Sequence, residues 1–405
     1  MKNTKCNNCK SNKLKKVFSL GSLSFSGRFG KNKNEDIPKD YLNLVICNRC
    51  NLVQLDRYFN PRYLYGKGYG YRTGINKTMT VHVEKTVQKA IKLTNLKPGN
   101  FVLDIASNDG TLLNFYPNSI KTVGIDPLIN KYKKYYKKIN FKILSFFQKN
   151  KILKLKFDKF KVITALSVFY DLRNPNEFLS DVRDILEKDG VFILEHADLY
   201  SIIKNNVFDT ICHEHLSYFS SEVIINMVEK NGLRVFKHEF NDINGGSSRY
   251  YICHKISKYK IHKSVSKVLK LEKKYKISKK ETLQKFFKKI KIECIKLSSL
   301  IKKIKKKKQS IHGYGASTKG NILLQFCKLG KREIDFIAER NPLKYNLYTP
   351  GTKIKIISES DSRKMLPNFY LVLPWHFKKE ILIREKKALD KKTNFIFPLP
   401  KLKIV

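Results

Sequence analysis

Residues 100–116 read NFVLDIASNDGTLLNFY, and this stretch decides the fold of the 405-residue chain. It opens with a short apolar run that carries Asp104 near its end, and a loop with Gly110 follows. An apolar run of this kind, bounded by loop residues, predicts a buried β-strand. The next apolar run, in TVGIDP at 122–127, ends at Asp126 and predicts a second strand. Two such strands with a connection between them mark the start of a βαβ arrangement.

The same alternation continues along the chain. Residues 160–169 (FKVITALSVF) predict a third strand, and residues 176–190 (NEFLSDVRDILEKDG) predict a helix that Gly190 ends. Residues 191–197 (VFILEHA) predict the strand after it. Strands that alternate with helices favour an α/β domain with a mostly parallel sheet of the Rossmann-like, doubly wound kind.

The loop after the first strand has the form D-x-A-x-N-D-G and not the G-x-G-x-x-G of dinucleotide-binding folds. A loop of the shape D-x-[GA]-x-x-x-G, followed by an acid after the second strand, is typical of S-adenosylmethionine sites. Gly110 would let the backbone approach the methionine portion, and Asp126 could accept both ribose hydroxyls. The alternative is that Asp126 is only one of the acids that doubly wound proteins often carry after a strand.

The composition describes a folded protein with room for two or three domains. Hydrophobic residues at 42% and aromatic residues at 12% exclude a disordered chain. No stretch approaches the roughly 20 consecutive apolar residues that a membrane-spanning helix requires. Residues 1–16, MKNTKCNNCKSNKLKK, lack the apolar core of a signal peptide. We therefore expect a cytoplasmic protein without a membrane span.

The formal net charge of +48 allows two interpretations. The lysines are scattered over the whole chain, alongside many Ile, Asn, Phe and Tyr residues, which favours solvated faces shaped by AT-rich codon usage. The second interpretation is a polyanionic partner. A nucleic acid is the less favoured partner, because the chain has no RNP-like, helix-turn-helix or KH pattern.

The eight cysteines fall into two groups. Two CxxC pairs lie near the N-terminus, and each can present two thiolates to one ion. Because no secretory signal is present, such pairs favour a metal over disulfides. The expected ligands of a closed, structural Zn²⁺ site are Cys6, Cys9, Cys47 and Cys50, while the isolated cysteines are Cys212, Cys253, Cys294 and Cys327. The insert between the pairs is expected to form its own strands or loop.

The C-terminal part begins with a lysine-rich stretch from about residue 256. Within it, apolar residues from Leu283 to Ile304 recur at steps of three and four, which predicts a long amphipathic helix that packs on its own chain or forms a coiled coil. SIHGYGASTKGNILL at 310–324 then predicts a strand, a Gly-rich turn and a helix, and a further strand ends near Glu339. The turn could seat a phosphate at the helix N-terminus or be only a tight connection.

With these pieces in order, the chain resembles the sugar C-methyltransferases that act on nucleotide-linked keto-deoxysugars. The motifs that carry the resemblance are CNNC…CNRC, YRTG, VLDIASNDGTLL, GIDP, FDTICHEHLSYFS, NGGSSR, GYGASTKGN, YTPGT and LPWHF, in the family's order along the chain. The resemblance implies a zinc-binding domain at 1–68 and an S-adenosylmethionine-dependent methyltransferase domain of class I at 69–255. It also implies a smaller Rossmann-like domain with leading amphipathic helices at 256–405.

The segment DTICHEHLSYF at 209–219 is where the resemblance places the chemistry. If this segment is extended, His213 and His215 point to one side and Glu214 to the other, which is a poor metal site. The two histidines could be core residues with satisfied partners. The resemblance instead implies that His215 is the general base that removes a proton next to the sugar ketone, a task that suits imidazole. Glu214 would serve the sugar or orient a neighbour.

The rest of the predicted site combines positions that match the family's motifs with positions where this chain departs from them. The further catalytic candidates are Tyr71 and Asp171. The expected cofactor-binding residues are Asp104, Ala106, Asn108, Asp109, Gly110, Asp126, Pro127, Phe147 and Ser167.

The chain departs from the family pattern at three positions of this site. The family carries Tyr where this chain has Cys212, and an Asn-x-x-x-His pattern where this chain has Ser167 and Asp171. Tyr71 and Tyr170 could replace the missing phenol.

The expected function is methyl transfer to carbon, at C-3, of a nucleotide-linked keto-deoxysugar through an enolate formed by His215. The resemblance favours dTDP as the nucleotide. The alternatives are methylation of a sugar oxygen on the same fold and a non-catalytic basic zinc protein that binds a polyanion. The sequence indicates no oligomeric state.

Overall fold

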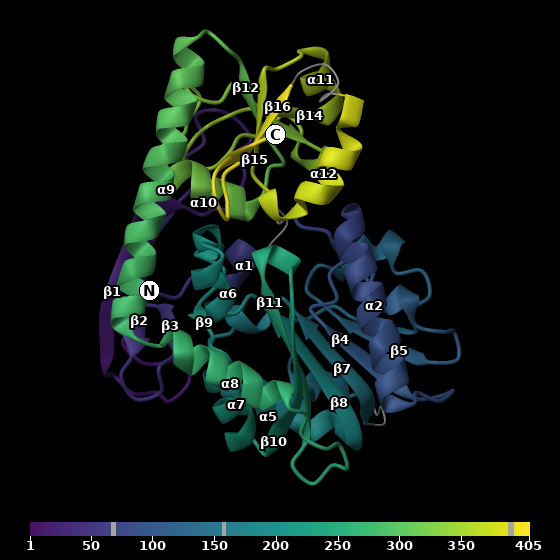
Figure 1. The fold of residues 1–405 in the computed structure, drawn as a ribbon. Coiled ribbons are helices and arrows are strands. Elements are labelled where there is room, and N and C mark those ends of the chain that lie inside the picture. Colours follow the sequence, from purple (N-terminus) through teal and green to yellow (C-terminus); the bar gives the residue numbers. More distant parts are fainter. Residues whose placement is uncertain (66–69, 156–158, 388–392) are drawn as a thin grey trace.

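The fold was analysed in a computed structural model, which describes residues 1–65, 70–155, 159–387 and 393–405. Three β-sheets organise the chain, and Figure 1 shows the C-terminal sheet domain above the central one, with the long helix α9 (Lys280–Lys306) along one side of both. The expected boundary between residues 68 and 69 lies outside the described residues, and the boundary at 255 stays a proposal. None of the described helices combines the length and the apolarity needed to cross a membrane.

The N-terminal sheet is antiparallel and has the strand order β1-β2-β3-β9. Its first three strands come from the insert between the cysteine pairs and from the residues that follow the second pair. The fourth comes from far along the chain and pairs with β3, so Val53 lies opposite Tyr218. The bounds are β1 (Leu14–Ser24), β2 (Lys39–Cys47), β3 (Val53–Leu55) and β9 (Ser217–Tyr218).

The central sheet has the order β10-β11-β8-β7-β4-β5-β6, in which β6, β5, β4, β7 and β8 are parallel and β11 is antiparallel to both its neighbours. This is the strand order of class I methyltransferases and confirms the expected Rossmann-like core. Its strands are β4 (Phe101–Ile105), β5 (Lys121–Ile125), β6 (Phe141–Ile143), β7 (Phe160–Leu166), β8 (Leu186–His196), β10 (Leu233–Asn241) and β11 (Ser247–His254).

Alternation along β4 explains how the central sheet is buried on both faces. Val102 packs with helix α2 (Lys77–Thr94), whereas Leu103 and Ile105 point to the opposite face, because successive side chains of a strand alternate. That opposite face shares one continuous core with the other two sheets. The remaining helices around the central sheet are α1 (Pro61–Leu64), α3 (Ile129–Tyr132), α4 (Lys149–Leu153), α5 (Pro175–Ile185), α6 (Leu199–Lys204) and α7 (Ser221–Lys230).

One helix boundary differs from the sequence prediction. Helix α5 ends at Ile185, and β8 begins at Leu186, so Gly190 lies inside a strand and does not end the helix. A Cβ on Gly190 would come within 2.9 Å of the Phe160 carbonyl oxygen. Gly190 therefore serves the close approach of two backbones, a common reason for glycine in a strand.

The C-terminal sheet has the order β14-β13-β12-β15-β16-β17, with β17 antiparallel to β16 and the other neighbours parallel. The order confirms the expected second Rossmann-like unit. Its strands are β12 (Ile311–Tyr314), β13 (Phe336–Glu339), β14 (Ile356–Ser358), β15 (Phe369–Val372), β16 (Asn394–Phe397) and β17 (Lys403–Ile404). Its helices are α10 (Thr318–Phe326), α11 (Glu359–Lys364) and α12 (Lys378–Arg384).

Helices α8 (Ser264–Tyr275) and α9 connect the central and C-terminal domains. The apolar stripe of α9 is buried against its own chain, with Phe287 stacked on Phe18 of β1 at 4.6 Å between ring centroids. The stripe therefore needs no coiled-coil partner, and α9 ties the N-terminal sheet to the C-terminal domain (Figure 1).

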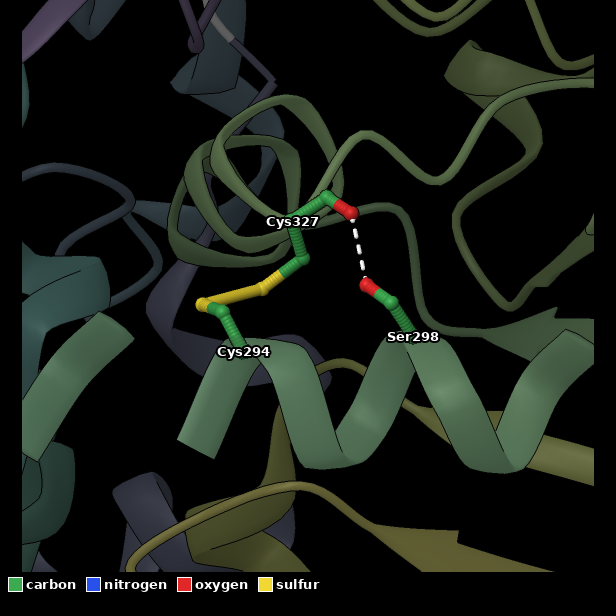
Figure 2. The surroundings of a disulfide bond; sticks show 3 residues. All are labelled: Cys294, Ser298 and Cys327. Atoms are coloured by element: carbon green, nitrogen blue, oxygen red, sulfur yellow. Dashed lines mark hydrogen bonds between the residues drawn. A yellow bond between two sulfur atoms is a disulfide. The ribbon is translucent and has the colours of Figure 1, made fainter. Parts of the chain in front are cut away.

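Two cysteines that the sequence left isolated are joined in the structure. Cys294 of α9 forms a disulfide with Cys327, which follows α10 (Figure 2). The Ser298 hydroxyl, one turn further along α9, donates a hydrogen bond of 2.9 Å to the Cys327 carbonyl. This pairing was not predicted, because a separation of 33 residues gives no local signal.

Candidate active site

A first cavity, of about 290 Å³, opens at the carboxyl ends of β4, β5 and β7, and we refer to it as the strand-end cavity. Ligands of doubly wound sheets bind at these strand ends. Six of the expected cofactor-binding residues line it, namely Asp104, Ala106, Asn108, Asp126, Pro127 and Ser167.

Two buried carboxyl groups face this cavity. Asp126 accepts hydrogen bonds from the backbone N–H groups of Asn108 and Leu128 at 2.9 and 2.6 Å. Burial raises the pKa of Asp126 to about 6 and that of Asp104 to about 7. A cationic or hydroxyl-bearing ligand at this site would favour the charged form of both groups, and of Asp104 above all.

The loop after β4 also organises the YRTG segment. Asn108 Oδ1 accepts a hydrogen bond from the Thr73 backbone N–H at 3.0 Å, and Asp109 Oδ2 accepts one from Gly74 at 2.9 Å. Gly110 has φ +73°, and a Cβ there would meet the Ile139 side chain at 2.6 Å. Asp109 and Gly110 lie behind the cavity wall and shape the loop instead of lining the space.

Phe147 also lies away from the strand-end cavity. Its ring packs against Phe178 at 5.0 Å, while the neighbouring Phe146 lines the cavity. The sequence cannot tell the two apart, because both follow the same strand and differ only in which way the loop turns.

A charged network at the floor of this cavity was not predicted from the sequence. Glu195, at the end of β8, accepts hydrogen bonds from His82 at 2.6 Å and from Arg249 at 2.7 Å. All three side chains are largely buried, and Glu195 and His82 line the cavity. Burial would raise the pKa of Glu195, but the His82 hydrogen bond and the Arg249 charge lower it overall.

A second cavity, also of about 290 Å³, lies between the domains, and we refer to it as the interdomain cavity. The N-terminal domain contributes Gly27 and Phe29, the central domain contributes His215, and the C-terminal domain contributes Lys319 among others. Four residues line both cavities: Tyr65, Tyr71, Ser167 and Asp171. The two cavities therefore meet, as a donor site and an acceptor site must in a group-transfer enzyme.

The HEH segment is bent and not extended, since β9 begins only at Ser217. The alternation expected for a strand therefore does not apply, and the two histidines separate. His213 is fully buried, with its ring 4.6 Å from Phe25 and 5.0 Å from Phe59 of the N-terminal domain. It lies in the interface with the zinc-binding sheet and lines neither cavity.

His215 lines the interdomain cavity with a defined tautomer. Its Nδ1 lies 2.7 Å from the Thr210 carbonyl oxygen, which can only accept, so Nδ1 carries the proton and Nε2 carries the lone pair. The Tyr170 ring lies against the imidazole at 4.0 Å. Burial, followed by the nearby positive charge of Lys319, overcomes the hydrogen bond to Thr210 and lowers the pKa of His215 to about 3. The ring is therefore neutral at physiological pH.

Glu214 lies on the same bend and also lines the interdomain cavity. Its Oε2 accepts a hydrogen bond from the Ser26 hydroxyl at 3.4 Å, while Oε1 has no partner among the described residues. Burial raises the pKa of Glu214. An unpartnered buried oxygen of this kind is suited to a ligand hydroxyl.

The three departures from the family pattern occupy different places. Ser167 and Asp171 lie where the cavities meet, whereas Cys212 is fully buried and lines neither cavity. Burial raises the pKa of Asp171 well above its usual value, and its Oδ1 has no partner in the part of the chain that the structure describes. Burial therefore favours the protonated form of Asp171, and that form can donate as well as accept a hydrogen bond.

Two phenols lie near the same junction. Tyr71 is nearly half exposed and lines both cavities, and Tyr170 lines the interdomain cavity beside His215.

The Gly-rich turn after β12 forms a wall of the interdomain cavity. Gly315 has φ +83°, and a Cβ there would lie 2.7 Å from Pro374. The Ala316 backbone N–H already donates to Glu339 Oε2 at 2.7 Å, and the Ser317 hydroxyl caps α10 by accepting from Gly320 at 3.0 Å. Two polar groups of the turn are therefore already engaged in hydrogen bonds within the fold.

The four N-terminal cysteines converge as a Zn²⁺ site requires. Their sulfur atoms all lie within 4.8 Å of one another, and the Cys6–Cys50 and Cys9–Cys47 sulfur pairs are 3.5 Å apart. Each knuckle closes on a residue with positive φ, Lys10 at 58° and Asn51 at 61°. Four thiolates at these separations fit a tetrahedral ion with Zn–S bonds of about 2.3 Å.

Comparison with known proteins agrees with this architecture. Successive parts of the chain match a zinc binding domain over residues 6–65, a methyltransferase domain over 78–238 and a C-methyltransferase C-terminal domain over 242–400. The chain is thus an S-adenosylmethionine-dependent C-methyltransferase, of the class that joins these three domains. Within that class it is a distant homologue of C-methyltransferase NovU from Streptomyces niveus, with 28% identity over 394 residues that cover 96% of this chain and 94% of NovU.

Solved methyltransferase structures are similar to part of the chain. An S-adenosylmethionine-dependent methyltransferase from Clostridium acetobutylicum ATCC 824 matches with 11% identity and a TM-score of 0.35, covering 43% of this chain and 92% of that chain. Magnesium protoporphyrin IX methyltransferase from Synechocystis PCC 6803 matches with 14% identity and a TM-score of 0.35, covering 48% and 92%. The fold assignment itself rests on the strand order described above.

Proposed function

We propose that the chain transfers the methyl group of S-adenosylmethionine to carbon C-3 of a nucleotide-linked 4-keto-6-deoxysugar. The observation that carries this proposal is the tautomer of His215: the Thr210 carbonyl holds its Nδ1–H, so Nε2 is a free base in a cavity that meets the strand-end cavity. A neutral imidazole has the free lone pair that removal of the proton next to a ketone requires. A dTDP-linked sugar and a cytoplasmic location, both expected from the sequence, are part of the proposal.

The donor fits the strand-end cavity. Asp126 is suited to the ribose hydroxyls, and Asp104 is suited to a cationic group of the methionine portion. Bound there, S-adenosylmethionine supplies an activated methyl group, so the protein has mainly to create a carbanion and align it with that methyl.

The acceptor fits the interdomain cavity. Glu214 and Asp171 offer unpartnered oxygen atoms for sugar hydroxyls or for the ketone, and burial favours the protonated form of Asp171, which can also donate. Further from His215, the guanidinium of Arg340 and the ammonium of Lys344 line the wall formed by the C-terminal domain. Such cations are suited to a diphosphate, which is the common feature of nucleotide-linked sugars.

In the proposed reaction, His215 Nε2 accepts the proton from C-3 and the sugar oxygen becomes an enolate. Tyr170 holds the imidazole in place from the side, and Thr210 keeps the tautomer. Zn²⁺ at the four cysteines would stabilise the domain that packs on His213 and take no part in the chemistry.

The test uses dTDP-4-keto-6-deoxysugar deuterated at C-3 and S-adenosylmethionine with a ¹³C-labelled methyl group. We expect a ¹³C methyl group bonded to carbon in the product NMR spectrum and loss of the C-3 deuterium. His215→Gln should lower turnover about 10²–10⁴-fold, the usual contribution of a general base. The matched control is His262→Gln, since His262 is exposed and outside both cavities. A methyl group on oxygen, or normal turnover in His215→Gln, would contradict the proposal.

A further inference from the structure

Lys319 is a buried ammonium group that the function proposed above does not use. It is the second residue of α10, in the GYGASTKGN motif, and its side chain is only 13% exposed. It lines the interdomain cavity together with His215. A buried lysine without a full set of partners is costly, so its position needs a reason.

Side chains and backbone from three other motifs converge on this ammonium. Nζ donates a hydrogen bond of 2.7 Å to the Asn244 carbonyl oxygen and lies 3.8 Å from Asp209 Oδ1. The Trp375 ring lies 5.9 Å from it, and the indole Nε1–H donates to Asp209 Oδ2 at 2.8 Å. FDTICHEH, NGGSSR, GYGASTKGN and LPWHF, which are far apart in the sequence, therefore meet at one nitrogen atom.

The Lys319 ammonium is held in place, but its N–H donors are not all used. An ammonium has three N–H donors, and one is used by Asn244. The 3.8 Å separation from Asp209 is too long for a hydrogen bond, and Asp209 Oδ1 has no hydrogen-bond partner among the described residues. Donors therefore remain for a ligand oxygen in the cavity, while the carboxylate of Asp209 balances the charge.

The positive charge acts at the reaction centre. After burial, the charge of Lys319 is a cause of the lowered pKa of both His215 and His376. Burial lowers the pKa of Lys319 itself, and the negative charge of Asp209 opposes that shift. The groups that face Lys319 are thus Asp209, Cys212, His215 and His376.

We propose that Lys319 is a catalytic residue that stabilises the enolate oxygen formed when His215 removes the C-3 proton. The assignment rests on the function proposed above. The C–H electron pair forms the C3–C4 double bond, the carbonyl π pair moves onto oxygen, and that negative charge lies against the ammonium. The carbonyl then re-forms as C-3 bonds to the methyl group, and the C–S pair stays on sulfur. The proton leaves through His215 to water.

This role does not depend on a phenol at position 212. Cys212 carries a thiol and lines neither cavity, so it offers an oxyanion no phenol. A fixed cation stabilises developing negative charge more strongly than a neutral donor does.

The test separates proton removal from methyl transfer. Wild-type protein, dTDP-4-keto-6-deoxysugar and S-adenosylhomocysteine are incubated in D₂O, and exchange of the C-3 proton is followed by NMR. We expect Lys319→Met to lower the exchange rate at saturating sugar about 10²–10³-fold, the usual effect of losing one oxyanion partner. Calorimetric titration with S-adenosylmethionine checks that the variant is folded. The matched control is Lys331→Met, because Lys331 is exposed near the end of the same segment.

The pH dependence of the exchange rate provides a second test. In the alkaline range His215 and His376 are neutral and the Cys212 pKa is raised well above its usual value, so among the groups named only Lys319 titrates. Asp209→Asn removes a charge that raises the pKa of Lys319 and should move the alkaline limb of the exchange profile to lower pH.

Each outcome decides the matter. Two results together support the assignment. The wild type exchanges the C-3 proton and Lys319→Met does not, and the alkaline limb of the pH profile of exchange is shifted in Asp209→Asn. Wild-type exchange that persists in Lys319→Met, with only a higher KM for the sugar, would assign Lys319 to substrate binding and overturn it. An unshifted alkaline limb would also overturn it. If the wild type does not exchange the C-3 proton at all, the proposed function is refuted, and the proposed role of Lys319 is refuted as well.

Discussion

Replacing Arg249 by Met should destabilise the central domain strongly, because it leaves the buried carboxylate of Glu195 without its main counter-charge. Glu195 and Arg249 are joined at 2.7 Å, and their side chains are 2% and 5% exposed. Removing one partner of a buried ion pair costs about 3–5 kcal/mol. For a domain of this size, each kcal/mol lowers the melting temperature by roughly 2–4 °C, so Tm should fall by about 6–20 °C.

The pH dependence of this loss has a definite sign. In the wild type, the pKa of Glu195 is lowered, so its contribution to stability is present above its unfolded pKa and fades as pH falls through the folded value. In Arg249→Met, burial without the guanidinium should raise that pKa above the unfolded value. A raised group contributes stability at low pH and loses it as pH rises through the folded pKa. The gap in Tm between variant and wild type should therefore be smaller at pH 5 than at pH 8.

Thermal unfolding followed by circular dichroism or calorimetry measures both effects. The control is Lys89→Met, which breaks the ion pair of Lys89 with Glu239 on the same face of the domain, where the lysine side chain is half exposed. Exposed pairs contribute little, so this control should stay close to wild type. The double variant Glu195→Gln with Arg249→Met should recover part of the loss, since no buried charge remains. If Arg249→Met melts no lower than Lys89→Met, the reasoning fails.

Two further predictions concern the cysteines. Native mass spectrometry should show one bound Zn²⁺ per chain that is lost in Cys6→Ser but kept in Cys253→Ser, and a metal-free wild type would contradict the four-cysteine site. Alkylation of the unfolded, unreduced protein in the presence of a chelator should label six cysteines and spare Cys294 and Cys327, whereas eight labelled cysteines would contradict the disulfide.

The parts of the fold that the sequence could predict are those with a local signal. The apolar run that carries Asp104, the acid at Asp126 and the knuckles closed by Cys9 and Cys50 all depend on neighbours within a few residues. Strand periodicity, turn chemistry and metal-ligand spacing act over the same short range. The connection rules for parallel strands then leave few possible topologies for the two Rossmann-like sheets.

The parts that could not be predicted depend on contacts between distant segments. Gly190 reads as a helix stop, but the backbone of Phe160 in the neighbouring strand decides its role. The bend of the HEH segment is set by its docking on the N-terminal domain, which places His213 between two phenylalanine rings. Lys319 looks like any other residue of a Gly-rich turn until Asn244 and Asp209 are brought beside it.

The pairing of β9 with β3 has a consequence for how the protein is made. The ribosome releases β1, β2 and β3 early, but the strand that covers the free edge of β3 is synthesised only after residues 56–216. At roughly 5–20 residues per second, that interval lasts about 10–30 s. An uncovered strand edge invites pairing with other nascent chains. The cysteine knuckles need only residues 6–50, so early capture of Zn²⁺ would hold the unfinished sheet together until its last strand arrives.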